Sequence, residues 1–288
     1  MLIDLGIAPI VLTKPDKPAH RGQKLQATPV KSSALLHQLS VLQPPTLKDP
    51  TVVEQLKNEN PDLFVSIAYG EYIPKEILEI PKLGTINLHP SLLPKYRGAA
   101  PVQRALMAGE TETGITVAEV TQAWDAGDIL AQERFPIAPE DDTGSLLDKL
   151  ADRGAAMLKG LLPKLLDNKV ARTPQNHPEA TFAPMIRDEE RWIDWKRPAD
   201  EIVNLIRGLS PKPGARARFK GGQLLIYRAR TVSTSGTPGT VVSLEKEGPA
   251  IAAGEGALLP LDLLPENRKR MSGKDFMNGY HLQIGQTI

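Results

Sequence analysis

Short apolar runs alternate with helical stretches over the first 166 residues, and this alternation constrains the fold more than any other feature. The runs at 63–68 (LFVSIA) and 85–88 (TINL) have the length of buried strands, whereas 143–166 has apolar residues at helical spacing, with Thr143 as the expected N-cap. The same reading predicts strands at 8–13, 41–43 and 115–120, and helices at 51–60, 74–80 and 99–108. The alternation predicts an α/β fold with a Rossmann-like, mostly parallel sheet covered by helices on both faces.

The pattern changes after residue 168. Prolines at 174, 178 and 184 interrupt any regular element, so the segment 169–184 is predicted to be a linker. Beyond it we expect a helix at 199–209 and short strands at 215–219, 223–228, 239–244, 250–253 and 257–261. Closely spaced short strands indicate a small OB-like β-barrel. The sequence therefore predicts an α/β domain at 1–168, the linker, and an OB-like domain at 185–288.

Composition narrows the class of protein. The chain contains no cysteine, which excludes disulfides and thiolate metal sites. No apolar run has the length of about 20 residues that a membrane span needs. We therefore expect a soluble, cytoplasmic protein without membrane contact. We also expect the protein to be a monomer. From Met185 to the end, 16 basic residues stand against 12 acidic ones, which is compatible with an anionic partner or with an ordinary solvated surface.

Three polar residues in the α/β domain suggest chemistry. Asn87 and His89 lie two positions apart at the end of a predicted strand, so both side chains point to the same side of an extended chain. Asp125 follows the next predicted strand and can approach the same edge of the sheet, where ligands bind in parallel α/β proteins. Asn can stabilise a developing oxyanion, His can move protons, and Asp can set the charge of the His. The alternative is a hydrogen-bonded histidine at a strand end and an Asp that caps a turn before Gly127.

The longer string around these residues, NLHPSLLPKYRGAAPVQRALMAGETETGITV followed by WDAGD, resembles the folate-dependent formyltransferases. The segments KPDKPAHRGQKL and RWIDWKRPADEIVNLIRGLSPKPGARA are similar to the branch of that family that formylates methionyl-tRNA. The likeness covers nearly the whole chain. It implies a metal-independent transfer of a formyl group from 10-formyltetrahydrofolate to the α-amino group of initiator methionyl-tRNA, in support of translation initiation.

The resemblance also implies roles for individual residues. Asn87, His89 and Asp125 match the family's catalytic triad. The segment that lines the folate site is matched by Ser91, Leu92, Leu93 and Pro94. A basic loop that reaches the acceptor stem of the tRNA is matched by Arg21, with Lys14, Lys17 and Lys24 in the same loop. The C-terminal domain matches the family's tRNA-binding module.

The basic residues of both domains have an alternative interpretation, in which they only keep an exposed surface solvated. A charged, proline-containing loop such as 14–24 is usually exposed to water without a partner. A second basic group surrounds a predicted turn in the C-terminal domain: Arg207, Lys212, Arg216 and Arg218. Contact with phosphates is the functional interpretation of this group, and a solvated face is the alternative.

The sequence departs from the family pattern at its start. Family members open with a strand and a glycine-containing loop ahead of a helix, whereas Met1–Leu5 resembles only the end of that helix, with Gly6 as its stop. The resemblance thus implies an N-terminally truncated catalytic domain. Trp124 stands where relatives carry a smaller aliphatic residue and is expected to affect the folate pocket. Two alternative functions remain: a formyltransferase that acts on an amino sugar, and a truncated paralogue that binds tRNA without turnover.

Overall fold

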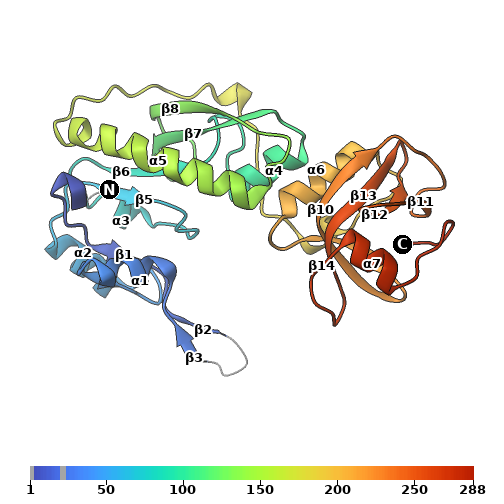
Figure 1. Cartoon of the computed structure of the whole chain (residues 1–288). Coiled ribbons are helices and arrows are strands. Elements are labelled where there is room, and N and C mark those ends of the chain that lie inside the picture. Colours follow the sequence, from blue (N-terminus) through green and yellow to red (C-terminus); the bar gives the residue numbers. More distant parts are fainter. Residues whose placement is uncertain (1–2, 20–23) are drawn as a thin grey trace. The chain divides into compact units, whose positions relative to one another are not determined.

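The computed structural model describes residues 3–19 and 24–288 (Figure 1). The chain divides into two compact units, each built from segments that are distant in sequence. The first unit comprises Met1–His89, Ile115–Glu133 and Ala151–Ala180. The second unit comprises Pro90–Gly114, Arg134–Leu150 and Thr181–Ile288. In the part of the chain that is described, no helix is both long enough and apolar enough to cross a bilayer.

The main sheet of the first unit has the strand order β5-β6-β7-β8. Its strands are β5 (Phe64–Ser66), β6 (Thr85–His89), β7 (Glu112–Glu119) and β8 (Ile129–Pro136). β5 and β6 are parallel, as the alternation predicts, whereas β6 and β7 are antiparallel. The alternation of elements predicts their order but not the direction in which each strand enters the sheet, so this mixed pairing emerges only from the structure.

A separate two-stranded parallel sheet in the first unit pairs β1 (Val11–Leu12) with β4 (Val41–Leu42). The accompanying helices are α1 (Pro29–Leu36), α2 (Pro50–Asn58) and α3 (Lys75–Leu78). The sequence predicted both strands, somewhat longer, and it predicted α2 and α3 but not α1. Where α2 begins, Asp49 Oδ1 accepts a hydrogen bond from Thr51 N at 2.9 Å. A small buried core joins these elements: Leu47, Val52, Leu56 and Ile77.

Helix α5 (Thr143–Leu166) has the predicted bounds, but the predicted N-cap is wrong. Asp142 is the residue that caps the helix, because its Oδ1 accepts a hydrogen bond from Ser145 N at 2.9 Å. Thr143 Oγ1 instead donates to the carbonyl oxygen of Gly208 at 2.8 Å. The Thr143 hydroxyl therefore makes a tertiary hydrogen bond to Gly208 instead of capping the helix, as the sequence pattern had predicted.

The apolar face of α5 packs on the strands that lead to the predicted triad. Gly154 lets the helix approach β6 closely, because a Cβ at this position would lie 2.6 Å from Leu88 Cδ2. The buried residues of this second core are Ile86, Val117, Leu158, Leu161, Leu162 and Leu165. Each such side chain stabilises the fold by roughly 1.5–3 kcal/mol when fully buried. The end of β6 is therefore anchored by the helix that covers it.

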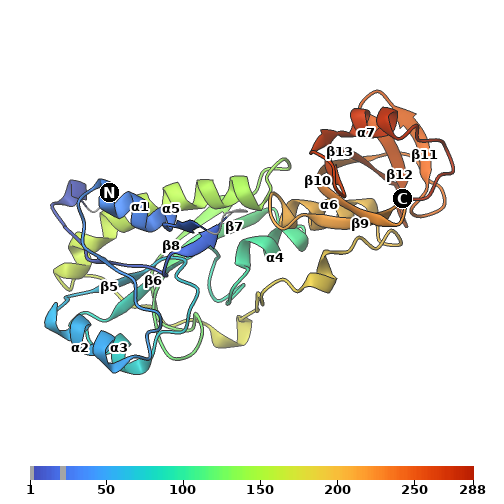
Figure 2. The ribbon, with the colours of Figure 1, turned by 90° about the horizontal axis from the view of Figure 1, so that it is seen from below.

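The second unit is built around an antiparallel sheet of order β11-β12-β13-β10-β9, with β14 paired to β13 (Figure 2). Its strands are β9 (Ala215–Phe219), β10 (Gly222–Val232), β11 (Val241–Glu245), β12 (Gly248–Ala252), β13 (Ala257–Pro265) and β14 (Met271–Ser272). Its helices are α4 (Pro101–Met107), α6 (Ala199–Leu209) and α7 (Gly273–Gly279). The predicted C-terminal strands and the predicted helix at 199–209 are confirmed, whereas α7 and β14 were not predicted.

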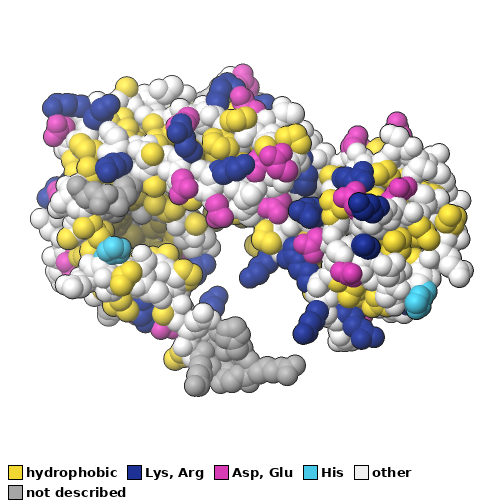
Figure 3. Space-filling model, viewed as in Figure 1, with side chains coloured by type: hydrophobic (Ala, Val, Ile, Leu, Met, Phe, Trp, Pro, Cys, Tyr) yellow, Lys and Arg dark blue, Asp and Glu magenta, His cyan; other side chains and the backbone are white. Residues whose placement is uncertain are grey.

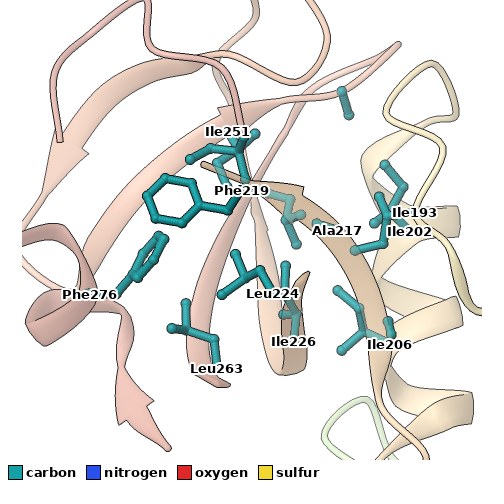
Figure 4. Packing of buried hydrophobic residues seen from close by; sticks show 14 of the residues in the cluster. Ile193, Ile202, Ile206, Ala217, Phe219, Leu224, Ile226, Ile251, Leu263 and Phe276 are labelled. Carbon is teal, nitrogen blue, oxygen red and sulfur yellow. The ribbon is translucent and has the colours of Figure 1, made fainter. Parts of the chain in front are cut away.

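A large apolar cluster forms the core of the C-terminal part of the second unit (Figure 4). Alternate residues of β9 and β10 point into it, including Phe219 and Ile226, and Ile206 contributes from α6. Phe276 of α7 is completely buried, and its ring lies 4.9 Å from the ring of Phe219 in an edge-to-face arrangement. Alternate side chains of β9 and β10 therefore face the core, as the pleat of a strand requires.

Candidate active site

Strand β6 carries Asn87 and His89 to its carboxyl end. Asn87 lies opposite Ser66 of β5 on one side and Ala118 of β7 on the other, and His89 lies opposite Thr116. His89 is only 4% exposed, although it ends the strand. β6 lies between β5 and β7 in the sheet. Because Asn87 and His89 are two positions apart, both side chains point to the same face of the sheet, as their spacing in the sequence predicted.

Asp125 meets both residues from the segment between β7 and β8. Asn87 Nδ2 donates to Asp125 Oδ1 at 3.3 Å. The same carboxylate oxygen lies 3.6 Å from His89 Nδ1, which is too long for a hydrogen bond but forms an ion pair when the imidazole is protonated. The side chains of His89 and Asp125 are 5% and 14% exposed, so little water screens this interaction. The structure thus brings the three predicted residues together.

The backbone around Asp125 has an unusual conformation. Asp125 has a φ of +49°, in the left-handed region that residues with a side chain seldom adopt. Gly127 lies so close to β7 that a Cβ there would meet the carbonyl oxygen of Glu119 at 2.1 Å, which only glycine permits. Asp128 then accepts a hydrogen bond from Glu119 N at 2.9 Å through its carbonyl. Trp124, one residue before the Asp, is 60% exposed.

The predicted folate segment follows His89 directly and belongs to the second unit. Ser91 and Leu93 are buried, whereas Leu92 and Pro94 remain partly exposed. Ser91 Oγ donates to the carbonyl oxygen of Lys95 at 2.6 Å, so this hydroxyl shapes the segment. The two side chains that this segment leaves partly exposed, Leu92 and Pro94, are both apolar.

Tyr96 lies just beyond this segment and was not singled out by sequence reasoning. It has a φ of +60°, and its hydroxyl donates to Glu110 Oε1 at 2.7 Å. Burial, together with this neighbouring carboxylate, raises the pKa of the Tyr96 phenol well above its ordinary value. The phenol therefore stays protonated and acts as a fixed hydrogen-bond donor in the second unit.

The predicted basic loop is partly regular structure. Lys17 and Lys24 lie in β2 (Lys17–Ala19) and β3 (Lys24–Gln26), which pair antiparallel, so the expectation of a simple loop is corrected for these two positions. Lys17 is exposed. Lys14 Nζ lies 3.6 Å from Glu71 Oε1, in a partly exposed ion pair. Arg21 lies outside the described residues.

The members of the second basic group, around 207–218, make different contacts. Arg207 is bound within the second unit, because its guanidinium donates to the carbonyl oxygens of Asp141 at 2.7 Å and Ala138 at 2.9 Å. These bonds use Nε and Nη2 of its guanidinium. Arg218 places its guanidinium 4.9 Å from the centre of the Trp192 ring. On the face of the second unit in Figure 3, basic and acidic side chains are interspersed, which agrees with pairs such as Arg270–Asp262 at 2.6 Å.

The arrangement fits acyl transfer. An amide donor, an imidazole and a carboxylate converge at the end of a strand, and within residues 3–19 and 24–288 no group of three or more His, Asp or Glu residues could hold a metal ion. An Asn–His–Asp set with a buried His supplies a donor for a developing oxyanion and a route for a proton. The geometry therefore supports the functional interpretation of the motif over the purely structural one.

Comparison with known proteins identifies the family. The Formyl transferase family model matches residues 6–162, and the Formyl transferase C-terminal domain model matches residues 185–281. The methionyl-tRNA formyltransferases of Syntrophus aciditrophicus and Moorella thermoacetica are each 44% identical over 280 residues, covering 96% of this chain and 90% of the relative. The chain belongs to the formyl transferase family.

Solved structures agree on the fold. HypX from Aquifex aeolicus in complex with tetrahydrofolic acid has a TM-score of 0.64 and 21% identity, covering 88% of this chain and 44% of HypX. The sugar 3N-formyl transferase WlaRD has a TM-score of 0.64 and 19% identity, covering 90% of this chain and 88% of WlaRD. At these identities the likeness extends to the fold alone.

Proposed function

We propose that this protein transfers the formyl group of 10-formyltetrahydrofolate to the α-amino group of methionyl-tRNA, the initiator tRNA that begins translation. The convergence of Asn87, His89 and Asp125 is the observation that supports formyl transfer. The acceptor follows from relatives that are 44% identical along 96% of the chain and that are named for methionyl-tRNA. An amino-sugar acceptor is supported only by folds with about 20% identity.

Each residue of the triad has a distinct task in this reaction. The α-amino group of an aminoacyl ester attacks the formyl carbon, a C–N bond forms, and the bond from that carbon to N10 of the folate breaks. A free α-amino group has a pKa of about 7.7–8.0, so a useful fraction is neutral near pH 7.5. Asn87 donates to the formyl oxygen as it gains negative charge, and loss of such a donor costs about 3 kcal/mol in comparable sites.

His89 and Asp125 handle the proton. The amine must lose a proton and N10 must gain one, so a group that exchanges protons near neutral pH is needed. The carboxylate of Asp125 lies 3.6 Å from His89 Nδ1, so it forms an ion pair with the imidazolium when His89 carries the proton. Its bond to Asn87 Nδ2 also fixes the amide, which keeps the donor for the formyl oxygen oriented.

The folate is held by the segment that follows His89. The partly exposed Leu92 and Pro94 suit the flat rings of a pterin, and the family to which the chain belongs uses this co-substrate. Ser91 and Leu93 contribute by shaping the segment from within.

The tRNA is bound by basic residues of both proposed domains. We assign catalysis to residues 1–168, a connecting role to 169–184, and tRNA binding to the OB-like domain 185–288; the two family models match inside these bounds. Arg21, Lys14, Lys17 and Lys24 contact the acceptor end, where each phosphate contact adds a salt-dependent increment of affinity. The protein acts as a monomer in the cytoplasm, where charged initiator tRNA is used.

The test is a formylation assay with the full chain, 10-formyltetrahydrofolate and charged initiator tRNA. We expect turnover by the wild type and a loss of about 100-fold to 10,000-fold in kcat for Asp125→Asn. Asp152→Asn is the matched control, because Asp152 is an exposed carboxylate on α5 of the same unit. Formylation of an amino sugar instead of the charged tRNA would overturn the proposed acceptor, and full activity of Asp125→Asn would overturn the proposed triad.

A further inference from the structure

Gln175 reaches the segment that carries Asp125 from a part of the sequence predicted to be only a linker. Its side-chain amide donates to the carbonyl oxygen of Asp125 at 2.9 Å and to the carbonyl oxygen of Gly127 at 2.7 Å. These two bonds use both hydrogens of the amide. Gln175 is 6% exposed, and all three residues belong to the first unit.

The chain on either side of Gln175 is held against the same region. Thr173 and Ile129 exchange two backbone hydrogen bonds, at 2.8 and 2.9 Å. Residues 173–175 therefore run beside the turn that connects β7 to β8, and this backbone pairing places Gln175 next to that turn.

The conformation of Asp125 needs such support. A residue with a side chain costs about 1–3 kcal/mol in the left-handed region and persists only where the surroundings determine it. Both carbonyl oxygens bound by Gln175 flank Ala126, so the amide clamps the backbone directly after the strained residue. A shift of this backbone would move Asp125 Oδ1 away from Asn87 Nδ2 and His89 Nδ1.

We propose that Gln175 is a positioning residue for the reaction, which holds the Asp125 carboxylate in place by clamping the carbonyl oxygens of Asp125 and Gly127. This inference rests on the proposed function, since it assigns Gln175 a task in the same site. Gln175 does not touch the reacting groups. Its effect is therefore expected on kcat, with KM for charged tRNA and for the folate left essentially unchanged.

The first variant is Gln175→Met, which keeps the length of the side chain but cannot donate. We expect kcat to fall about 10-fold to 100-fold, because a displacement near 1 Å costs on that order in a preorganised site. Arg172→Met is the matched control: it removes an exposed ion pair three residues away, worth at most about 1 kcal/mol, and leaves both carbonyl contacts intact. Its kcat should match that of the wild type.

The second variant, Gln175→Glu, separates positioning from space filling. An ionised carboxylate cannot donate to two carbonyl oxygens, whereas the protonated acid can donate to one of them. The activity of Gln175→Glu relative to the wild type should therefore rise as the pH falls from about 8 to about 6, because burial among carbonyl oxygens favours the protonated form. The relative activity of Gln175→Met should not vary with pH.

Amide hydrogen exchange of residues 125–129 provides a measurement that needs no substrate. We expect faster exchange there in Gln175→Met than in the wild type and in Arg172→Met. Wild-type kcat and unchanged exchange in Gln175→Met would overturn the proposal. If that variant does not fold, the pH dependence of Gln175→Glu decides, and a flat ratio counts against positioning. A wild-type chain that formylates no charged tRNA refutes the proposed function, while the exchange experiment still tests the clamp.

Discussion

The two units of this protein differ in how they bury their apolar residues. In the second unit, a large cluster joins β9 to β13 with α6 and α7, and Phe276, Ile226 and Leu258 in it are fully buried. In the first unit, the described residues include a smaller cluster beside β6 and another beside β1 and β4. The proposed catalytic triad lies in the first unit, beside the cluster that packs on β6.

Strand pairing explains part of this difference. In the second unit, the described strands β9 to β14 form one sheet, so a single layer of side chains faces α6 and α7. In the first unit, the pair β1-β4 and the sheet β5-β6-β7-β8 are not joined by strand pairing within the described residues. The large cluster of the second unit therefore lies against one continuous sheet, and hydrophobic stabilisation scales with the apolar area that is buried.

The largest expected effect comes from the core of the second unit. Phe276→Ala should lower the free energy of unfolding of that unit by about 3–5 kcal/mol, since it removes a fully buried ring and leaves a cavity. Hydrogen exchange of β10 and β13 in the full chain measures this. Phe182→Ala is the control, because Phe182 is 72% exposed, and its effect should stay within about 0.5 kcal/mol. Equal effects of the two variants would contradict the burial of Phe276 in this cluster.

A smaller effect is expected from the core beside β1 and β4. Leu56→Ala should cost about 2 kcal/mol, at the lower end for a buried leucine, because the small cluster around it can relax into the space. Hydrogen exchange of α2 measures the loss, and the amides of β10 and β13 should keep their wild-type protection. Leu36→Ala, at a site 79% exposed, is the control. A loss as large as that of Phe276→Ala would remove the distinction between the units.

The smallest effect concerns an ion pair of the second unit. The hydrogen bond from Arg104 lowers the pKa of Glu190 to about 2, with Arg104 Nη1 at 2.6 Å from Oε1. A lowered pKa means that the pair stabilises the fold above the ordinary value of 4.5 and that this contribution is lost as the pH falls towards about 2. Glu190→Gln should therefore destabilise the chain by about 1 kcal/mol at pH 7.

The difference between the wild type and Glu190→Gln should shrink as the pH is lowered below about 4.5. Urea denaturation from pH 7 to about pH 3 measures this difference, with the m-value as a check on the mode of unfolding. Glu189→Gln is the matched control, since Glu189 is an exposed carboxylate whose side chain is 66% accessible. A difference that does not depend on pH would show that the charge of Glu190 contributes nothing.

Much of the architecture could be predicted because local patterns report local structure. The bounds of α5, α6 and β9 match their predicted ranges, since apolar spacing and flanking Gly or Pro residues mark such elements. The spacing of Asn87 and His89 placed both on one side of β6, and the resemblance indicated Asp125 as their partner. The helix α1 was missed, because its apolar residues do not form a clear stripe: Leu35 and Leu36 are both exposed.

The sequence by itself determined the order of the elements, the inward faces of the strands and the identity of the reactive side chains, because these depend on periods of two and 3.6 residues and on residue chemistry. Only the tertiary structure decided that β7 runs antiparallel to β6, that Asp142 rather than Thr143 caps α5, and that Gln175 clamps the backbone beside Asp125. Each of these depends on a partner at least 27 residues away or on competition with one, and no local pattern records such a contact.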